Sequence, residues 1–318
     1  MKKEILYIVV PCYNEEEVLE ETTKRLKNKI EKLISDKKIS DESRVMYVND
    51  GSGDKTWKLI EKISKREKCF TGISLSRNRG HQNALLAGLM TAKKYANLII
   101  SMDADLQDDI DAIDEMIEKY YAGAEIVYGV RSARKTDTWF KRTTAEGFYK
   151  FMSMMGVDIV FNHADYRLAS KNVLDKLEEF HEVNLFLRGI FPLIGYKTDI
   201  VYYERNERFA GESKYPLKKM LNFAWDGITS FSVKPIRFIL SFGIIVSIIS
   251  FILMIVFLIL NLTHLKTIGI GTVISLICFL FGLQTSFIGI IGEYIGKTYV
   301  ETKQRPRYFI SGNLNEDN

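Results

Sequence analysis

Two aspartates in the pattern Asp-Ala-Asp, Asp103 and Asp105, directly follow an apolar run over residues 97–102. Carboxylates at the end of a buried strand need a compensating charge, and a Mg²⁺ or Mn²⁺ ion shared with substrate phosphates supplies one. Gln107 could add a neutral oxygen ligand. Aspartates also begin helices, which is the role expected for those within residues 108–111. The pair at 103 and 105 therefore predicts a divalent-cation site for a phosphorylated ligand.

Polar residues also follow two other predicted strands. Asp50 comes after an apolar strand and before a Gly-Ser-Gly turn, where it is placed to accept hydrogen bonds from a nucleobase or ribose. Asp54, at the end of that turn, is better explained as a helix N-cap. Pro11, Tyr13 and Glu15 follow the first strand and could form the other wall of a nucleotide pocket.

A third group of side chains suits phosphate. Arginine presents a planar, bidentate fork to phosphate oxygens, and lysine supplies a point charge. Surface cations are usually solvated, but these lie between the predicted ligand end of the sheet and a predicted lipid surface. The group consists of Arg131, Arg134, Arg208, Ser213 and Lys214.

The segments that carry these residues alternate between short apolar runs and longer amphipathic runs. Strands that alternate with helices predict an α/β domain with a mainly parallel sheet, in which ligands bind at the carboxyl ends of the strands. The predicted strands are residues 5–10, 44–48, 71–75, 98–102 and 126–130, and the predicted helices are residues 15–35, 54–66, 81–94 and 109–121.

Two uncharged stretches, at about 238–262 and 267–292, each exceed the roughly 20 residues that cross a bilayer core. Because only a short turn separates them, they predict a two-helix transmembrane hairpin. An amphipathic segment before them predicts an interfacial helix, with packing on the soluble domain as the alternative. Basic residues flank the outer ends of the stretches, so the positive-inside rule places both termini in the cytosol and the protein in the plasma membrane. The predicted divisions are a catalytic domain at 1–214, the interfacial helix at 215–237, the transmembrane pair within 238–296 and a cytosolic tail at 297–318.

Composition excludes several other classes of function. A net charge of +4 over 318 residues is too small to indicate nucleic-acid binding. The three cysteines are far apart and form no disulfide or zinc pattern. Neither Gly-x-Gly-x-x-Gly nor a P-loop follows a strand, and nothing before Ile5 resembles a signal peptide. His81, His163 and His181 lack metal-ligand spacing and are expected to be structural or surface residues.

Four motifs in this order resemble those of family 2 glycosyltransferases: Val9–Glu16, Asn49–Ser52, Asp103–Asp108 and Arg208–Tyr215. Within that family the chain is similar to the polyprenyl-phosphate glycosyltransferases, which include dolichol-phosphate mannose synthase and the bactoprenol glucosyltransferases. The resemblance covers nearly the whole chain, including the hydrophobic hairpin. It implies a GT-A fold, inversion at the anomeric carbon, a nucleotide-sugar donor and a polyprenyl phosphate acceptor such as undecaprenyl phosphate.

The resemblance also implies roles for individual residues. Asp50 would contact the base of the nucleotide, with Pro11, Tyr13, Glu15 and Asp103 also in the donor site. The metal on the diphosphate would be held by Asp103, Asp105 and Gln107. Asp165, in Ala-Asp-Tyr-Arg-Leu, matches the catalytic aspartate proposed for the family, and Asp105 and Arg131 would take part in catalysis. Donor and acceptor phosphates would be bound by Arg131, Arg134, Arg208, Ser213 and Lys214.

Two sequence features limit the resemblance. Arg79 stands where relatives more often have an aromatic or small residue, which bears on the details of the donor pocket. The chain lacks Gln-x-x-Arg-Trp, a pattern of processive polysaccharide synthases, so single transfer is expected rather than polymerisation.

Several alternatives stay open. UDP-glucose or another UDP-hexose is the expected donor, with GDP-mannose or a UDP-amino-pentose as alternatives. A non-catalytic scaffold or carrier-lipid translocator is the alternative from another class. Glycines in the hairpin permit close helix contact, so association into a homo-oligomer is possible on sequence grounds.

Overall fold

The structure is a computed structural model that describes residues 3–131, 154–155, 163–204, 228–229, 232–262 and 270–315. These residues divide into two compact units. One contains the β-sheet with its helices and also residues 304–315, and the other contains two long helices and ends at Lys303.

In the first unit, eight strands of the described chain form one sheet in the order β7-β5-β6-β4-β1-β2-β3-β8. The four strands β4, β1, β2 and β3 are mutually parallel and rich in buried Val, Ile and Leu, as expected for a sheet covered on both faces. The predicted mainly parallel α/β sheet is confirmed, and it matches the GT-A arrangement that the resemblance implies. The strands are β1 (Leu6–Cys12), β2 (Arg44–Asn49), β3 (Phe70–Leu75), β4 (Leu98–Ser101), β5 (Ile126–Arg131), β6 (His163–Ser170), β7 (Thr198–Tyr203) and β8 (Ile310–Asn313).

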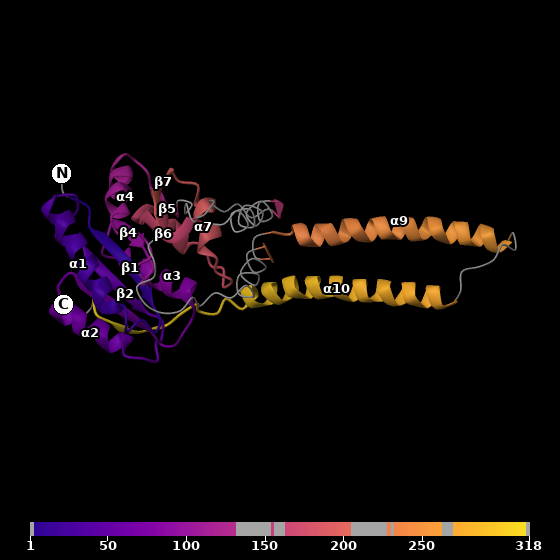
Figure 1. The fold of residues 1–318 in the computed structure, drawn as a ribbon, viewed down its shortest axis with the longest axis horizontal. Coiled ribbons are helices and arrows are strands. Elements are labelled where there is room, and N and C mark those ends of the chain that lie inside the picture. The colour runs from indigo at the N-terminus through magenta and orange to yellow at the C-terminus, as the bar shows by residue number, and fades with distance from the viewer. Residues whose placement is uncertain are drawn as a thin grey trace. The chain divides into compact units, whose positions relative to one another are not determined.

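Helices cover both faces of the sheet. Successive side chains of a strand point to opposite faces, so Ile8 and Val10 of β1 pack in a core shared with α1, while Val9 faces α3. The contact with α3 is close, because a Cβ on Gly88 would lie 2.4 Å from Val9 Cγ1. Figure 1 shows α1 and α3 on opposite sides of β1 and β2. The helices are α1 (Leu19–Ser35), α2 (Thr56–Arg66), α3 (His81–Ala92), α4 (Ala112–Tyr121), α6 (Lys171–Glu178) and α7 (Leu187–Ile194).

Strand β6 runs antiparallel between β4 and β5. Ser101, the last residue of β4, pairs with Arg167. Continued two residues past Ser101 and two residues back from Arg167, this antiparallel register brings Asp103 opposite Asp165. The Ser101 hydroxyl donates to the Asp165 carbonyl at 2.5 Å. The parallel strands and the antiparallel β6 therefore deliver carboxylates to the same edge of the sheet from opposite directions.

The end of the chain was predicted to be a tail, but part of it is strand β8, which pairs antiparallel with β3. The Leu314 amide donates to the Gly72 carbonyl at 2.9 Å, and the Ser76 amide donates to the Phe309 carbonyl at 2.9 Å. A four-residue strand with a glycine and an asparagine gives little periodic signal, which explains why the pattern did not reveal it.

The second unit consists mainly of α9 (Lys234–Leu262) and α10 (Ile270–Thr302). The rings of Phe242 and Phe287 meet edge to face at 5.5 Å, and the Tyr294 hydroxyl donates to the Ser232 carbonyl at 2.6 Å. In the part of the chain that the structure describes, one helical segment, Phe279–Thr302, is long and apolar enough by length and composition to cross a membrane. Most of the predicted interfacial helix at 215–237 lies outside the described residues.

Candidate active site

A cluster of charged side chains meets where the carboxyl end of β4 lies beside the beginning of β6. Its centre is Asp165, which is 4% exposed and therefore needs compensation for its charge. Arg167, two residues along the same strand, donates to Asp165 Oδ1 at 2.5 Å. Arg188 of α7 donates to both carboxylate oxygens, at 3.2 and 2.9 Å. A fork of two hydrogen bonds fixes the orientation of both groups.

The start of α3 contributes two further partners to Asp165. His81 Nε2 lies 3.4 Å from Asp165 Oδ2 and 3.8 Å from Asp103 Oδ1. Gln82 donates to Asp165 through Nε2 at 3.4 Å, while its Oε1 accepts from the Leu187 amide at 3.0 Å. The first residues of α3 therefore connect Asp165 to the beginning of α7.

These contacts set the ionisation of the cluster. Burial opposes the charge on Asp165, but Arg188, His81 and Arg167 together hold its pKa well below the ordinary value for a carboxyl. Burial also opposes protonation of His81, yet the hydrogen bond with Asp165 and the charge of Asp103 raise the pKa of His81 to about 9. Asp165 is therefore an ionised counter-ion for three cationic groups at neutral pH.

The pKa of Asp103 is shifted in the opposite direction to that of Asp165. Burial raises the pKa of Asp103 to about 6, His81 acts in the lowering direction, and the carboxylates of Asp108, Asp165 and Asp105 raise it further. An excess of negative charge remains beside Asp103, which is the electrostatic condition under which a cation binds.

The other residues predicted to hold a metal lie in the loop after Asp103. Asp105 Oδ1 accepts from the Gln107 amide at 3.2 Å, and Gln107 is buried. Among the described residues, no cluster of three or more His, Cys, Asp or Glu side chains could hold a metal by itself. Two carboxylates and one amide fit instead an ion that takes its remaining oxygen ligands from substrate phosphates.

Asp108 does not begin α4 as the sequence suggested. It is 2% exposed, and its Oδ1 accepts from the Tyr203 hydroxyl at 2.5 Å and from Arg131 at 3.2 Å. Arg131 also donates to the Tyr203 hydroxyl at 3.2 Å. The three side chains form a closed ring of contacts that fixes Arg131 at the carboxyl end of β5. Asp111 does occupy the N-cap position of α4.

Asp50 organises the loop between β3 and α3. Its two carboxylate oxygens accept from the backbone amides of Arg79 and Gly80, at 2.7 and 2.9 Å. Burial raises the pKa of Asp50, and these two hydrogen bonds act in the opposite direction. Next to it, Gly51 has φ +62°, and a Cβ there would lie 2.4 Å from the carbonyl carbon of Arg77. Only glycine fits this contact.

The loops after β1 and β2 are tied together. The Asn14 amide donates to Ser52 Oγ at 3.1 Å, the Gly53 amide donates to Asn14 Oδ1 at 3.0 Å, and the Glu15 amide donates to Thr56 Oγ1 at 2.9 Å. Pro11 is half-buried, as is Glu15, whereas Tyr13 is 44% exposed. The predicted nucleotide-site residues 11–15 therefore lie beside the turn after Asp50.

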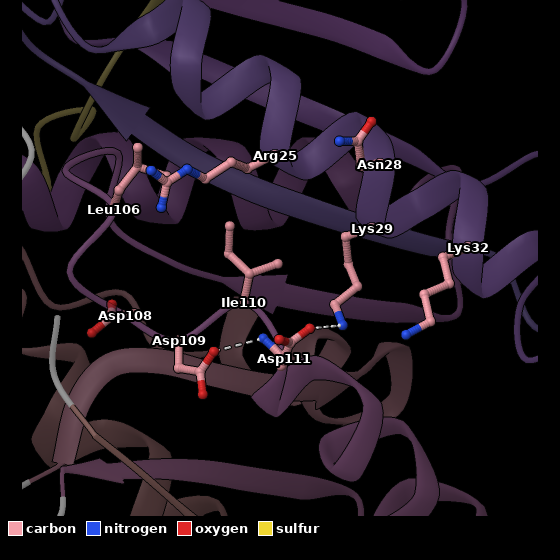
Figure 2. A pocket seen from close by; sticks show the side chains of 9 residues that line it. All are labelled: Arg25, Asn28, Lys29, Lys32, Leu106, Asp108, Asp109, Ile110 and Asp111. Atoms are coloured by element: carbon pink, nitrogen blue, oxygen red, sulfur yellow. Dashed lines mark hydrogen bonds and ion pairs between the residues drawn. The ribbon is translucent and has the colours of Figure 1, made fainter.

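Figure 2 shows a cavity of about 410 Å³ between α1 and the loop after Asp105. Opposite charges meet around it, because Lys29 Nζ lies 2.6 Å from Asp111 Oδ1 and 2.5 Å from Asp114 Oδ2. These pairs attach the loop to α1. The lining residues are Arg25, Asn28, Lys29, Lys32, Leu106, Asp108, Asp109, Ile110 and Asp111.

The structure brings together Asp103, Asp105, Gln107 and Asp165, while Asp50 follows β2 and Arg131 ends β5. Four predicted phosphate-binding residues lie outside the described residues: Arg134, Arg208, Ser213 and Lys214. Sequence reasoning missed Arg188 and assigned His81 a structural or surface role. Arg188 follows no strand of the predicted sheet, so no motif indicated it, whereas His81 begins a helix that directly follows a strand and a Gly.

Comparisons with known proteins show the family to which the chain belongs. The model of the family described as Glycosyl transferase family 2 matches residues 7–178. The uncharacterized glycosyltransferase YkoT of Bacillus subtilis is 53% identical over 98% of this chain and 92% of its own length. A prophage bactoprenol glucosyl transferase homolog of Escherichia coli is 41% identical over 95% of this chain and 97% of its own length. The bactoprenol glucosyl transferase of Shigella phage SfX is 39% identical over 95% of this chain and 97% of its own length. The family model and these relatives match over most of the chain, and the sheet carries an Asp-x-Asp pair at the carboxyl end of β4. The chain therefore belongs to glycosyltransferase family 2 and is a glycosyltransferase.

Proposed function

We propose that this protein transfers a sugar from a nucleotide-sugar, UDP-glucose or another UDP-hexose, to a polyprenyl phosphate at the cytosolic membrane face, with inversion at the anomeric carbon. The observation that carries the proposal is the meeting of an acidic edge, Asp103 and Asp105, with an arginine-rich group around Asp165. Relatives named for transfer to bactoprenol, alignable over nearly the whole chain, support the lipid acceptor.

The acceptor in this reaction needs little activation. A phosphate monoester has a second pKa near 6, so its oxygen is already largely ionised at neutral pH. The nucleophile therefore needs no strong base, and Asp165, with its pKa held low, would be a poor one. Asp165 acts instead by holding Arg188 and His81 in position, where they can neutralise a phosphate or orient the sugar.

Asp103, Asp105 and Gln107 would hold a Mg²⁺ or Mn²⁺ ion on the donor diphosphate. Their oxygen donors fit such an ion. Burial is the main cause of the raised pKa of Asp103, and the carboxylates of Asp108, Asp165 and Asp105 add to it, so a bound cation would offset both effects. When bound, the metal supplies electrostatic stabilisation of the departing nucleoside diphosphate.

The cationic residues would reduce the repulsion between the acceptor phosphate and the donor diphosphate. Arg131 is fixed by Asp108 and Tyr203, so it is preorganised to bind a phosphate group. Arg134, Arg208, Ser213 and Lys214 complete the proposed phosphate-binding set. Preorganised charges stabilise the transition state without rearranging during the reaction.

The proposed membrane attachment uses α9 and α10 as a two-span hairpin. Both helices expose large apolar side chains, among them Phe238, Ile244, Phe279 and Phe281. A helix that is apolar all round and exposed fits a lipid environment. Lysines and arginines at the outer ends of the pair support cytosolic termini. The polyprenyl tail would remain in the bilayer while its phosphate reaches the catalytic sheet.

Two other functions remain as alternatives. GDP-mannose or a UDP-amino-pentose would use the same fold, and Asp50 could meet the polar edge of either base. A scaffold or carrier-lipid translocator would not need the carboxylates of Asp103, Asp105 and Asp165. The arrangement of these carboxylates with three cationic groups favours the enzyme.

A donor panel tests the proposal. Purified protein, undecaprenyl phosphate and Mg²⁺ or Mn²⁺ are incubated with labelled UDP-hexoses, GDP-mannose and a UDP-amino-pentose, and label is followed into the lipid phase. We expect transfer from a UDP-hexose that Asp105→Ala abolishes. Transfer from another donor would replace the proposed one. Absence of lipid product from every donor, with nucleotide binding intact, would reject the polyprenyl phosphate acceptor.

A further inference from the structure

The residues that follow α10 return to the sheet of the catalytic unit. Residues 307–314, here called the C-terminal strap, include β8 and add a strand to the edge of β3. The fit is close at Gly312, where a Cβ would lie 3.0 Å from the ring of Trp57. Leu314 packs against the core beneath β3. The strap therefore contributes an edge strand to the sheet and packs against its core.

One end of the strap contacts the loop that Asp50 organises. The Ser76 amide donates to the Phe309 carbonyl at 2.9 Å, and the guanidinium of Arg79 lies 5.9 Å from the centre of the Phe309 ring. Asp50 binds the Arg79 amide from another direction at 2.7 Å. The loop at residues 76–80 is thus held between Asp50 and the strap, and it leads directly into His81 and Gln82.

The strap also contacts the segment before α7. Arg307 donates to the carbonyl of Phe180 at 3.0 Å and to that of Glu182 at 3.5 Å. The chain continues from there to Arg188, which forms the fork with Asp165. The two segments contacted by the strap therefore lead to His81, Gln82 and Arg188, which are three of the four side chains that bind Asp165 in the part of the chain that the structure describes.

We propose that the C-terminal strap is a positioning element of the active site. It fixes the loop at residues 76–80 through Phe309 and the segment at residues 180–182 through Arg307. This inference rests on the proposed function, because it places the 76–80 loop in the donor site. Phe309 and Arg307 act through other residues and do not themselves touch the reacting atoms.

Phe309 allows a test with little effect on the core, since its side chain is 54% exposed. Phe309→Ala removes the ring under Arg79, and we expect the KM for the donor and the Kd for UDP with Mn²⁺ to rise about 2- to 5-fold. Phe309→Tyr keeps the ring and should behave as the wild type. Ile310→Ala is the matched control, because Ile310 is the next residue of the strap, is 41% exposed and pairs with Leu75.

Arg307→Ala tests the second contact. Loss of hydrogen bonds from a charged group to two carbonyls should lower kcat about tenfold while leaving the KM for the donor little changed. Arg307→Lys should restore part of kcat, because both hydrogen bonds come from a single nitrogen, Nη1, and lysine keeps a charged donor on a more flexible stem.

Hydrogen exchange separates this inference from the proposed function. In the full-length protein, Phe309→Ala should speed exchange of amides in residues 76–82 and leave β1 unchanged. Wild-type exchange and wild-type UDP affinity in Phe309→Ala would overturn the inference. If the wild type binds no nucleotide, the proposed function fails, while the exchange measurement still decides whether the strap orders the loop.

Discussion

The contacts of Asp165 make a specific prediction for Asp165→Asn. The substitution keeps the shape of the side chain but removes the charge that balances Arg167, which is 1% exposed, and Arg188. Leaving one partner of a buried ion pair uncompensated costs about 3–5 kcal/mol. For a domain of this size, about 3 kcal/mol corresponds to a fall in Tm of roughly 6–12 °C.

The pH dependence of that stability loss has a definite sign. The pKa of Asp165 is lower in the folded protein than in the unfolded chain, so its ionisation stabilises the fold above about pH 4. This contribution is lost as the pH falls from there toward the folded pKa. The difference in Tm between wild type and Asp165→Asn should therefore be largest near pH 5–6 and shrink below pH 4, where Asp165 becomes protonated. It should also shrink as the pH rises from about 6.5 toward 9, because His81, whose pKa is raised to about 9 with the help of Asp165, loses its proton over that range. Thermal unfolding monitored by circular dichroism would measure both changes.

Activity distinguishes a base from a positioning residue. If Asp165 positions Arg188, then Asp165→Asn loses activity by a similar factor at every pH, because the acceptor phosphate needs no base and the cations stay displaced. The measurement is kcat/KM for lipid glycosylation from pH 5.5 to 9. An unchanged Tm, together with recovery of most activity above pH 8, would refute this reasoning and show that the carboxylate serves only to remove a proton.

Three further substitutions follow from contacts in the site. Arg188→Lys keeps the charge but loses the fork to Asp165, so kcat should fall about tenfold with little change in the KM for the donor, as steady-state kinetics would show. Asp108→Asn weakens the ring around Arg131 and should lower kcat/KM about tenfold, and an equal loss in a variant of the half-buried neighbour Asp109 would contradict the assignment. Gly51→Ala forces a Cβ against Arg77 at positive φ, and we expect a loss of about 1–3 kcal/mol in stability and weaker UDP binding by calorimetry.

Much of the fold followed from the spacing of apolar residues, because buried parallel strands and their helices have strong periodic signals. Asp103, Asp50 and Arg131 could be located for the same reason, since each follows a strand whose end was visible in the sequence. The structure places Asp103 after β4, Asp50 after β2 and Arg131 at the end of β5, while their roles in binding stay predictions.

Other parts of the site depend on packing that no local pattern encodes. Arg188 reaches Asp165 only because α7 packs beside β6, and His81 gains its partners from strands distant in sequence. Asp108 appeared to belong to the start of a helix, because its buried partner Tyr203 lies 95 residues away. The strap could not be predicted from the sequence for a related reason. A short edge strand such as β8 forms because it pairs with β3, and its own residues carry little strand signal.

The pairing of β4 with β6 makes the length of β6 part of the catalytic apparatus. Along this strand Asp165 and Arg167 share one face, while Tyr166 points to the other and meets Tyr203. Removing or adding one residue between Asp165 and Arg167 would turn Asp165 to the opposite face while Arg167 keeps its pairing with β4, placing a carboxylate toward the apolar core. Substitutions at the rim of the site can therefore change substrate specificity without disturbing the cluster, whereas an insertion or deletion within β6 would separate Asp165 from its partners.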